Sequence, residues 1–165
     1  MSPLNRLSAL FRGRARVEPA ELDSYGEVVG PVTARLATLY ARWRQDLELF
    51  SAEPEMANAA SIQRWEAAGL LDQLRPVRPP TTLVRAHSEL ASIIADTARA
   101  AQLLSNGYRF HSSRARCDGH SLMLASEARF GALCKSLVAS GLGIASITDG
   151  AGAGRDAAGG SAAGG

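Results

Sequence analysis

The sequence predicts an all-helical protein, namely an antiparallel up-and-down bundle of four helices. Apolar residues recur at alternating spacings of four and three over several long segments, which is the pattern of a buried helix face. Aromatic residues make up only 5% of the chain, which favours closely packed helices over a sheet. Prolines and glycines separate the segments by short connections, so sequential helices are expected to be antiparallel neighbours.

The 165 residues divide into three parts. We expect an amphipathic basic leader at 1–17, a helical bundle domain at 19–142 and a Gly/Ala-rich tail at 149–165. The tail has too little apolar surface to offset the entropy of ordering, so it is expected to be disordered. The central domain is long enough to bury about two-thirds of the surface of its unfolded chain. One hydrophobic core is therefore expected.

The first helix of the domain has an apolar stripe that Gly30-Pro31 interrupts. The stripe consists of Leu22, Tyr25, Val29, Val32, Leu36, Leu39 and Trp43. Proline lacks the backbone donor that a helix interior needs, so the helix is expected to kink or break there. A turn near residues 52 and 53 brings the end of the second helix level with Gly30. Residues 19–29 are then expected to overhang the bundle or to fold back as a short helix.

The second helix is expected to begin at Pro54-Glu55 and to run to Leu74, because a proline and an acid are typical of a first turn. Its predicted apolar face consists of Met56, Ala59, Ile62, Trp65 and Leu70. The following connector, residues 75–80, contains three prolines that exclude a helix. The chain therefore crosses to the third helix in an extended segment.

The third helix follows Pro79-Pro80 and ends at Asn106-Gly107. Its apolar stripe consists of Leu83, His87, Leu90, Ile94, Thr97, Ala101 and Leu104. The fourth helix is expected to start between Ser112 and Asp118, and Gly141 with Gly143 should stop it. Its predicted core residues are Met123, Phe130, Leu133 and Leu137.

The chain contains none of the motifs that carry known four-helix chemistry. The paired Glu-x-x-His of di-iron proteins, the Cys-x-x-Cys-His of haem attachment and the His-Glu-x-x-His of zinc helices are all absent. No glycine-rich phosphate loop joins a strand to a helix. We therefore predict a non-enzymatic interaction or scaffold protein that needs no cofactor. Its partner would be another protein or a second copy of the chain.

The connection between the third and fourth helices is basic and aromatic, which suits an anionic ligand. The ligand-binding candidates there are Arg109, His111, Arg114, Arg116 and His120. The rest of the domain has no basic stripe, which disfavours nucleic acid. Cys117, His120 and His111 are metal-ligand types, but their spacing matches no zinc motif, so no metal site is predicted.

His87 occupies a position of the third apolar stripe that Leu, Ile, Thr and Ala otherwise fill. The antiparallel arrangement places it level with small residues at 67–69 and 131–132. It could anchor a pocket, or it could be a hydrogen-bonded core histidine, which is the commoner case. The alternative function is therefore a sensor bundle for a small ligand, an anion or a metal. Such a sensor would bind its ligand either in the part of the bundle around His87 or at the Arg109–His120 turn.

The leader carries one apolar stripe and several basic residues. The expected membrane contacts are the stripe and its neighbouring arginines: Leu4, Leu7, Leu10, Phe11, Arg6 and Arg12. This pattern suits the surface of an anionic membrane, docking on the chain's own bundle, or a transit peptide. The chain has no apolar run long enough to cross a membrane, and its N-terminus lacks the apolar centre that a signal peptide needs. Its two cysteines are too far apart to pair if they share one helix. A cytoplasmic protein, peripheral to the inner face of a membrane, is expected.

Overall fold

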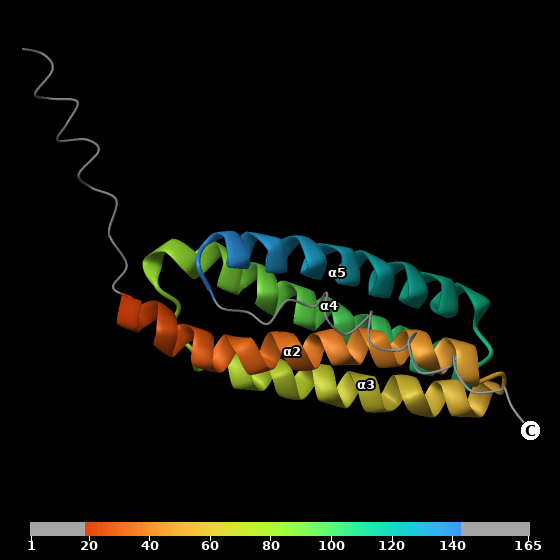
Figure 1. Ribbon diagram of the computed structural model, residues 1–165. Coiled ribbons are helices and arrows are strands. Elements are labelled where there is room, and N and C mark those ends of the chain that lie inside the picture. The colour runs from red at the N-terminus through yellow and green to blue at the C-terminus, as the bar shows by residue number, and fades with distance from the viewer. Residues whose placement is uncertain (1–18, 143–165) are drawn as a thin grey trace, which may run out of the picture.

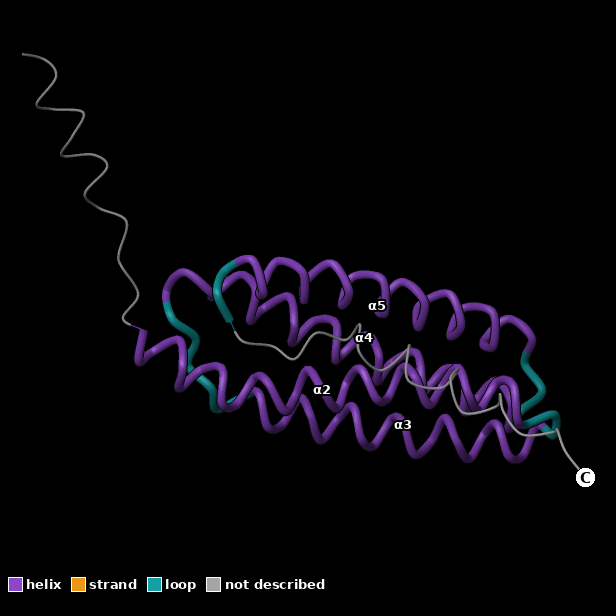
Figure 2. Tube along the Cα trace, viewed as in Figure 1, coloured by secondary structure: helices purple, strands orange, loops and turns teal. Residues whose placement is uncertain are grey.

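The computed structural model describes residues 19–142, and within this range every regular element is helical. The leader at 1–17 and the tail at 149–165 lie outside the described residues. The elements are α2 (Pro19–Leu49), α3 (Glu53–Leu74), the short 3-10 helix η2 (Thr81–Leu83), α4 (Val84–Arg109) and α5 (Ser113–Ala139). Figure 1 shows the long helices lying side by side, and Figure 2 shows the short loops that join them. The predicted all-helical class is confirmed.

The helices pack around one apolar core, but not all of them pack equally closely. The closest backbone packing joins α3 to α4 and α4 to α5, while α2 approaches α3 less extensively. Fully buried large side chains from every long helix meet in the core, among them Leu36, Leu70, Leu90, Ile94, Leu104, Met123 and Leu137. In the described part of the chain, no helix is both long and apolar enough to cross a membrane.

Of the predicted kink or break at Gly30-Pro31, the break is wrong, because α2 is one helix with Pro31 inside it. Pro31 is exposed, and so is Glu27, the residue whose carbonyl loses its helical backbone donor. The Thr33 hydroxyl donates to the carbonyl oxygens of Val29 and Gly30, at 3.0 and 2.8 Å, within the same turn. The segment 19–29 is not a separate or overhanging helix either, since Tyr25 and Val29 in it are buried.

The apolar face of α3 differs from the predicted one. Ile62 and Trp65 were expected in the core but are 52% and 70% exposed. Met56 and Leu70 are buried as predicted, and the rest of the inward face consists of Ala57, Ala60, Gln63, Ala67 and Leu74. Its alanines let α4 approach closely, and Gln63 donates to Asp46 at 3.2 Å. A hydropathy pattern assigns more weight to Ile and Trp than to this run of small residues, which explains the error.

α4 and α5 begin and end within a few residues of the predicted positions. Ser112 caps α5 by accepting a hydrogen bond from the Ala115 N–H at 3.3 Å. Gly141 has a φ of +85°, and the Leu142 N–H bonds the Leu137 carbonyl at 3.2 Å, which closes the last turn. Leu142 is itself buried, so the chain stays on the core up to the last described residue.

Two glycines bring the backbones of α4 and α5 together. A Cβ atom at Gly107 would lie 2.8 Å from the backbone nitrogen of Arg116. A Cβ atom at Gly119 would lie 2.7 Å from the Leu104 Cγ and 3.0 Å from the Leu104 nitrogen. Ordinary carbon contacts are about 3.5–4.0 Å, so both positions require glycine. This close approach fixes the register of α4 against α5.

Candidate functional site

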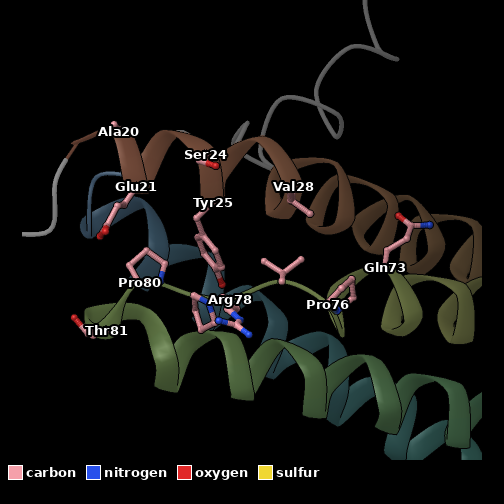
Figure 3. Close-up of a pocket in the computed structure, with 12 residues that line it drawn as sticks. Ala20, Glu21, Ser24, Tyr25, Val28, Gln73, Pro76, Arg78, Pro80 and Thr81 are labelled. Carbon is pink, nitrogen blue, oxygen red and sulfur yellow. The ribbon is translucent and has the colours of Figure 1, made fainter.

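An open groove of about 800 Å³ lies between the first turns of α2 and the proline-rich connector. Figure 3 shows the two walls, with Tyr25 projecting from α2 towards the connector. The lining residues come from α2, from the end of α3 and from the connector: Ala20, Glu21, Ser24, Tyr25, Val28, Gln73, Pro76, Val77, Arg78, Pro79, Pro80 and Thr81. The groove lies where α3 has ended at Leu74, so that the proline-rich connector rather than α3 runs beside the first turns of α2.

Tyr25 links the groove to His87 on α4. Its hydroxyl oxygen lies 3.1 Å from Nδ1 of His87, and the rings are 5.9 Å apart at their centroids. Burial raises the pKa of Tyr25 to about 12 and lowers the pKa of His87. The protonated phenol can therefore donate to a neutral imidazole at neutral pH. His87 is thus a hydrogen-bonded, half-buried histidine beside a groove, which combines the two interpretations that the sequence left open.

The rim of the groove carries few charges, and they lie on opposite walls. Glu21 belongs to α2, and Arg78 belongs to the connector. The exposed Asp23 and Glu27 also belong to the first turns of α2, but they do not line the groove. Within residues 19–142, Glu21 forms no salt bridge. Among the described residues, the lining of the groove therefore has one acid on the α2 wall and one base on the connector wall, and much of the rest of it is apolar.

A second polar cluster ties the other end of the molecule together. Glu53, in the first turn of α3, pairs with both His111 and Arg116. The hydrogen bond from His111 and the charge and hydrogen bond of Arg116 lower the pKa of the Glu53 carboxyl. Arg116 also lies over the ring of Tyr108, 5.6 Å from its centroid. The predicted basic turn is therefore neutralised in part by an acid from the first turn of α3.

His120 lies in the same cluster, between two aromatic residues. Its Nε2 is 3.1 Å from the Tyr108 hydroxyl, and its ring lies 5.6 Å from that of Trp43. Burial first, and then the positive charge of Arg116, lower the pKa of His120. The imidazole is thus held neutral, and it joins α2, α4 and α5.

The remaining candidates of the turn do not converge. Arg109 and Arg114 are exposed, and Arg109 borders a small cavity of about 260 Å³ together with His111. Cys117 is exposed, whereas Cys134 is buried and burial raises the pKa of its thiol to about 11. Among residues 19–142, no group of three His, Cys, Asp or Glu side chains is placed to hold a metal ion.

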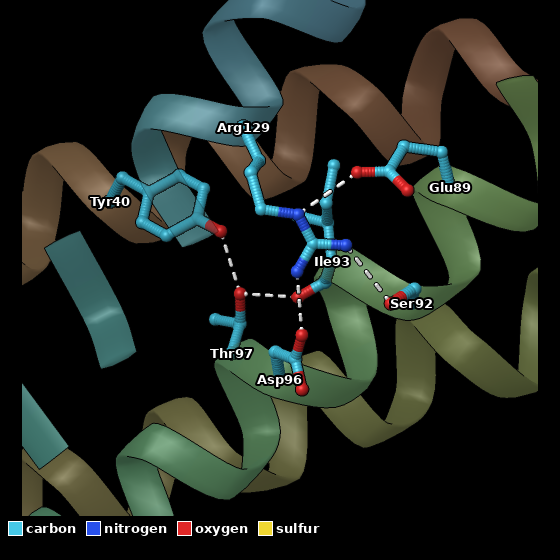
Figure 4. A network of polar contacts seen from close by, with 7 residues as sticks. All are labelled: Tyr40, Glu89, Ser92, Ile93, Asp96, Thr97 and Arg129. Carbon is cyan, nitrogen blue, oxygen red and sulfur yellow. Dashed lines mark hydrogen bonds and ion pairs between the residues drawn. The ribbon is translucent and has the colours of Figure 1, made fainter. Parts of the chain in front are cut away.

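A third polar network joins α5 to α4 (Figure 4). The guanidinium of Arg129 donates to Glu89 at 2.9 Å, to Asp96 at 2.7 Å and to Ser92 at 3.1 Å. The two carboxylates raise the pKa of Arg129. Beside it, the hydroxyls of Tyr40 and Thr97 are 2.6 Å apart, and Thr97 also donates to the Ile93 carbonyl. The polar groups of this network form hydrogen bonds with one another, which indicates that the network has a structural role.

Sequence reasoning missed Glu53 and most of the groove. Glu53 is 58 residues from His111 and 63 from Arg116, and a single sequence contains no signal for such a pairing. The groove did have a signal. The connector prolines exclude a helix. The antiparallel arrangement also predicted that the second helix would end level with Gly30 and would not cover residues 19–29. No protein-family profile, curated protein or solved structure matches the chain.

Proposed function

We propose that this chain is a non-enzymatic interaction module that docks a partner in the groove between α2 and the connector. The groove carries the proposal, because it is open, has an apolar floor of Tyr25, Val28 and prolines, and carries Glu21 on its α2 wall. A surface of this kind suits an apolar segment flanked by basic residues. The partner would be a protein segment of that composition.

The antiparallel up-and-down bundle is the proposed arrangement of the helices. It is supported by the short connections at 50–52 and 110–112. It is also supported by contacts between helices that are not consecutive, such as Tyr40 of α2 with Thr97 of α4 and Arg44 of α2 with Glu127 of α5. A kink of α2 at Pro31 is proposed as well, because the ring clashes with the preceding turn.

A non-catalytic role is supported by the engagement of the reactive side chains. His87 pairs with Tyr25, His120 with Tyr108, and Glu53 with Arg116. The Cys134 thiol, with its raised pKa, is a poor nucleophile at neutral pH. In the described part of the chain these contacts hold helices together.

We also propose that the leader places the protein on an anionic membrane surface at the cytoplasmic face. The support is the stripe of Leu4, Leu7, Leu10 and Phe11 beside four arginines. Each basic residue near an anionic surface contributes about 1 kcal/mol, so binding should be weak and sensitive to salt.

Co-sedimentation with vesicles of anionic phospholipid tests the membrane proposal. The full chain should sediment at low salt and be released at high salt, and neutral vesicles should retain little of it. A full-length Leu7→Glu, Leu10→Glu variant keeps the domain and its length but should stay in the supernatant. Equal recovery of both proteins in the supernatant at low salt would end the membrane proposal.

A small-ligand or anion sensor is the second candidate, and the contact of Tyr25 with His87 beside the groove favours it. A sensor that binds its ligand at the Arg109–His120 turn is less favoured, because Glu53 already pairs with His111 and Arg116. A melting-temperature screen with phosphate, sulfate and zinc tests the sensor, since a ligand selective for the folded state raises the apparent stability. A Tyr25→Phe variant should lose any shift that depends on the groove.

A further inference from the structure

We infer that the groove is the docking site of this chain's own leader, residues 4–11, when no membrane is present. The inference goes beyond the proposed membrane association and stands independently of it. It joins three observations: an open groove at the start of α2, an apolar and basic segment directly before α2, and an acid, Glu21, on the α2 wall of the groove.

The leader is attached at the rim of the groove. α2 begins at Pro19, and the next two residues, Ala20 and Glu21, line the groove. The groove follows α2 from Ala20 to Val28, a rise of about 12 Å, and a helix over residues 4–11 would be about 10 Å long. Residues 12–18 can span up to about 23 Å, which is enough to reverse the direction of the chain. Length and attachment point therefore permit docking.

The apolar surfaces match in kind. Val28 is 42% exposed, and Pro76, Val77 and Pro79 are at least partly exposed along the opposite wall. The leader offers one stripe of four large apolar side chains, Leu4, Leu7, Leu10 and Phe11. Burial of such side chains contributes about 25 cal/mol per Å² of apolar surface. Covalent attachment places the leader at an effective concentration of about millimolar, so even a weak contact is populated.

The charges also match. Residues 1–18 contain four arginines and one acid, Glu18. The α2 wall presents one acid to the groove, Glu21, which forms no salt bridge within residues 19–142. Arg78 lies on the connector wall and would repel the leader there. The leader's arginines should therefore face α2, and its apolar stripe should face the floor of the groove.

Docking and membrane binding would use the same leucines, so the two states exclude each other. In the docked state the leader would also cover the groove against other ligands. The groove would then become available to a partner only when the leader is drawn to a membrane. This coupling would make the membrane surface a positive effector of partner binding.

Photo-crosslinking in the full chain tests the docking. A diazirine-bearing amino acid replaces Leu7, the protein is irradiated without lipid, and mass spectrometry identifies the linked peptides. We expect links to residues 20–28 and 73–81 at a yield that does not depend on protein concentration. Links to residues 143–165, links to a second copy that increase with concentration, or no links to the groove would each overturn the inference.

Two matched variants show whether the groove itself is responsible. Val28→Arg places a charge on the floor and should reduce the yield about tenfold, because a buried unpaired charge is costly. Leu124→Arg makes a similar change at an exposed residue of α5, outside the groove, and should leave the yield unchanged. Equal yields in the two variants would overturn the inference, provided that circular dichroism shows both to be folded.

Vesicle binding separates this inference from the proposed function. Val28→Arg releases the leader and should sediment with anionic vesicles at least as well as the unmodified chain. If the chain crosslinks in the groove but never sediments, the docking stands and the membrane proposal fails. If it sediments but never crosslinks in the groove, the membrane proposal stands and the docking fails.

Discussion

Replacement of glycines in α5 by alanine should change stability in opposite directions at two positions. At Gly119 a Cβ atom would meet Leu104 Cγ at 2.7 Å, Leu104 N at 3.0 Å and Ala100 O at 3.1 Å. At Gly131, in the same helix, a Cβ atom would meet nothing within 4 Å among the described residues. The pair therefore compares one chemical change in a crowded and in an open environment.

The expected difference in the free energy of unfolding follows from two opposing contributions. Alanine is favoured over glycine inside a helix by about 1 kcal/mol, and this gain applies to both variants. Only Gly119→Ala also forces the backbones of α4 and α5 apart, and overpacking of this kind costs about 1–3 kcal/mol. The helix gain cancels in the comparison. The free energy of unfolding should thus be about 1–3 kcal/mol lower for Gly119→Ala than for Gly131→Ala.

Urea denaturation followed by circular dichroism at 222 nm measures this difference. Unfolding free energies of small proteins change by about 1–3 kcal/mol per molar urea, so the two midpoints should differ by about 1 M. Gly69→Ala, at another open position, should behave like Gly131→Ala. If Gly119→Ala unfolds at the same urea concentration as Gly131→Ala or at a higher one, α4 and α5 are not in backbone contact and the reasoning fails.

Two further predictions concern the polar groups. The pKa values of His87 and His120 are lowered by burial, so the unfolded chain takes up protons first as the pH falls through about 6.5, and the stability of the folded state should decrease below that pH. Thermal melts between pH 7.5 and 5 should show a smaller decrease in melting temperature when both histidines are replaced by Gln. An unchanged dependence of the melting temperature on pH would contradict the assignment. Tyr40→Phe removes the 2.6 Å hydrogen bond to Thr97 and should cost about 1 kcal/mol in urea unfolding. A neutral outcome would show that this bond adds no net stability.

The sequence predicted the core faces of three helices well, because large apolar residues mark them. Val29, Leu36, Leu90 and Phe130 are buried as expected. On the remaining helix, α3, Met56 and Leu70 are buried as expected, but the prediction was wrong for Ile62 and Trp65, which are exposed while alanines and Gln63 face the core. Periodicity reliably indicates that a segment is helical. Which face of the helix turns towards the core depends on where a neighbouring helix packs closely and therefore requires small residues.

The candidate sites were less predictable than the fold, because they depend on pairs that are distant in the sequence. His87 was singled out as unusual for its position, yet its partner Tyr25 is 62 residues away and looked like an ordinary core residue. The Arg109–His120 turn was recognised as basic, but Glu53, in the first turn of α3, pairs with two of its basic residues and changes its electrostatics. Such pairings follow from the tertiary arrangement, and a single sequence without relatives does not reveal them.

The lesser packing of α2 has a consequence for motion in the native state. α3, α4 and α5 share close backbone contacts, whereas α2 is attached mainly through side chains such as Tyr25, Tyr40 and Trp43. Amide hydrogens of α2 should therefore exchange with solvent through local openings that leave the other three helices intact. Because α2 supplies one wall of the groove, each such opening would also alter the width of the groove.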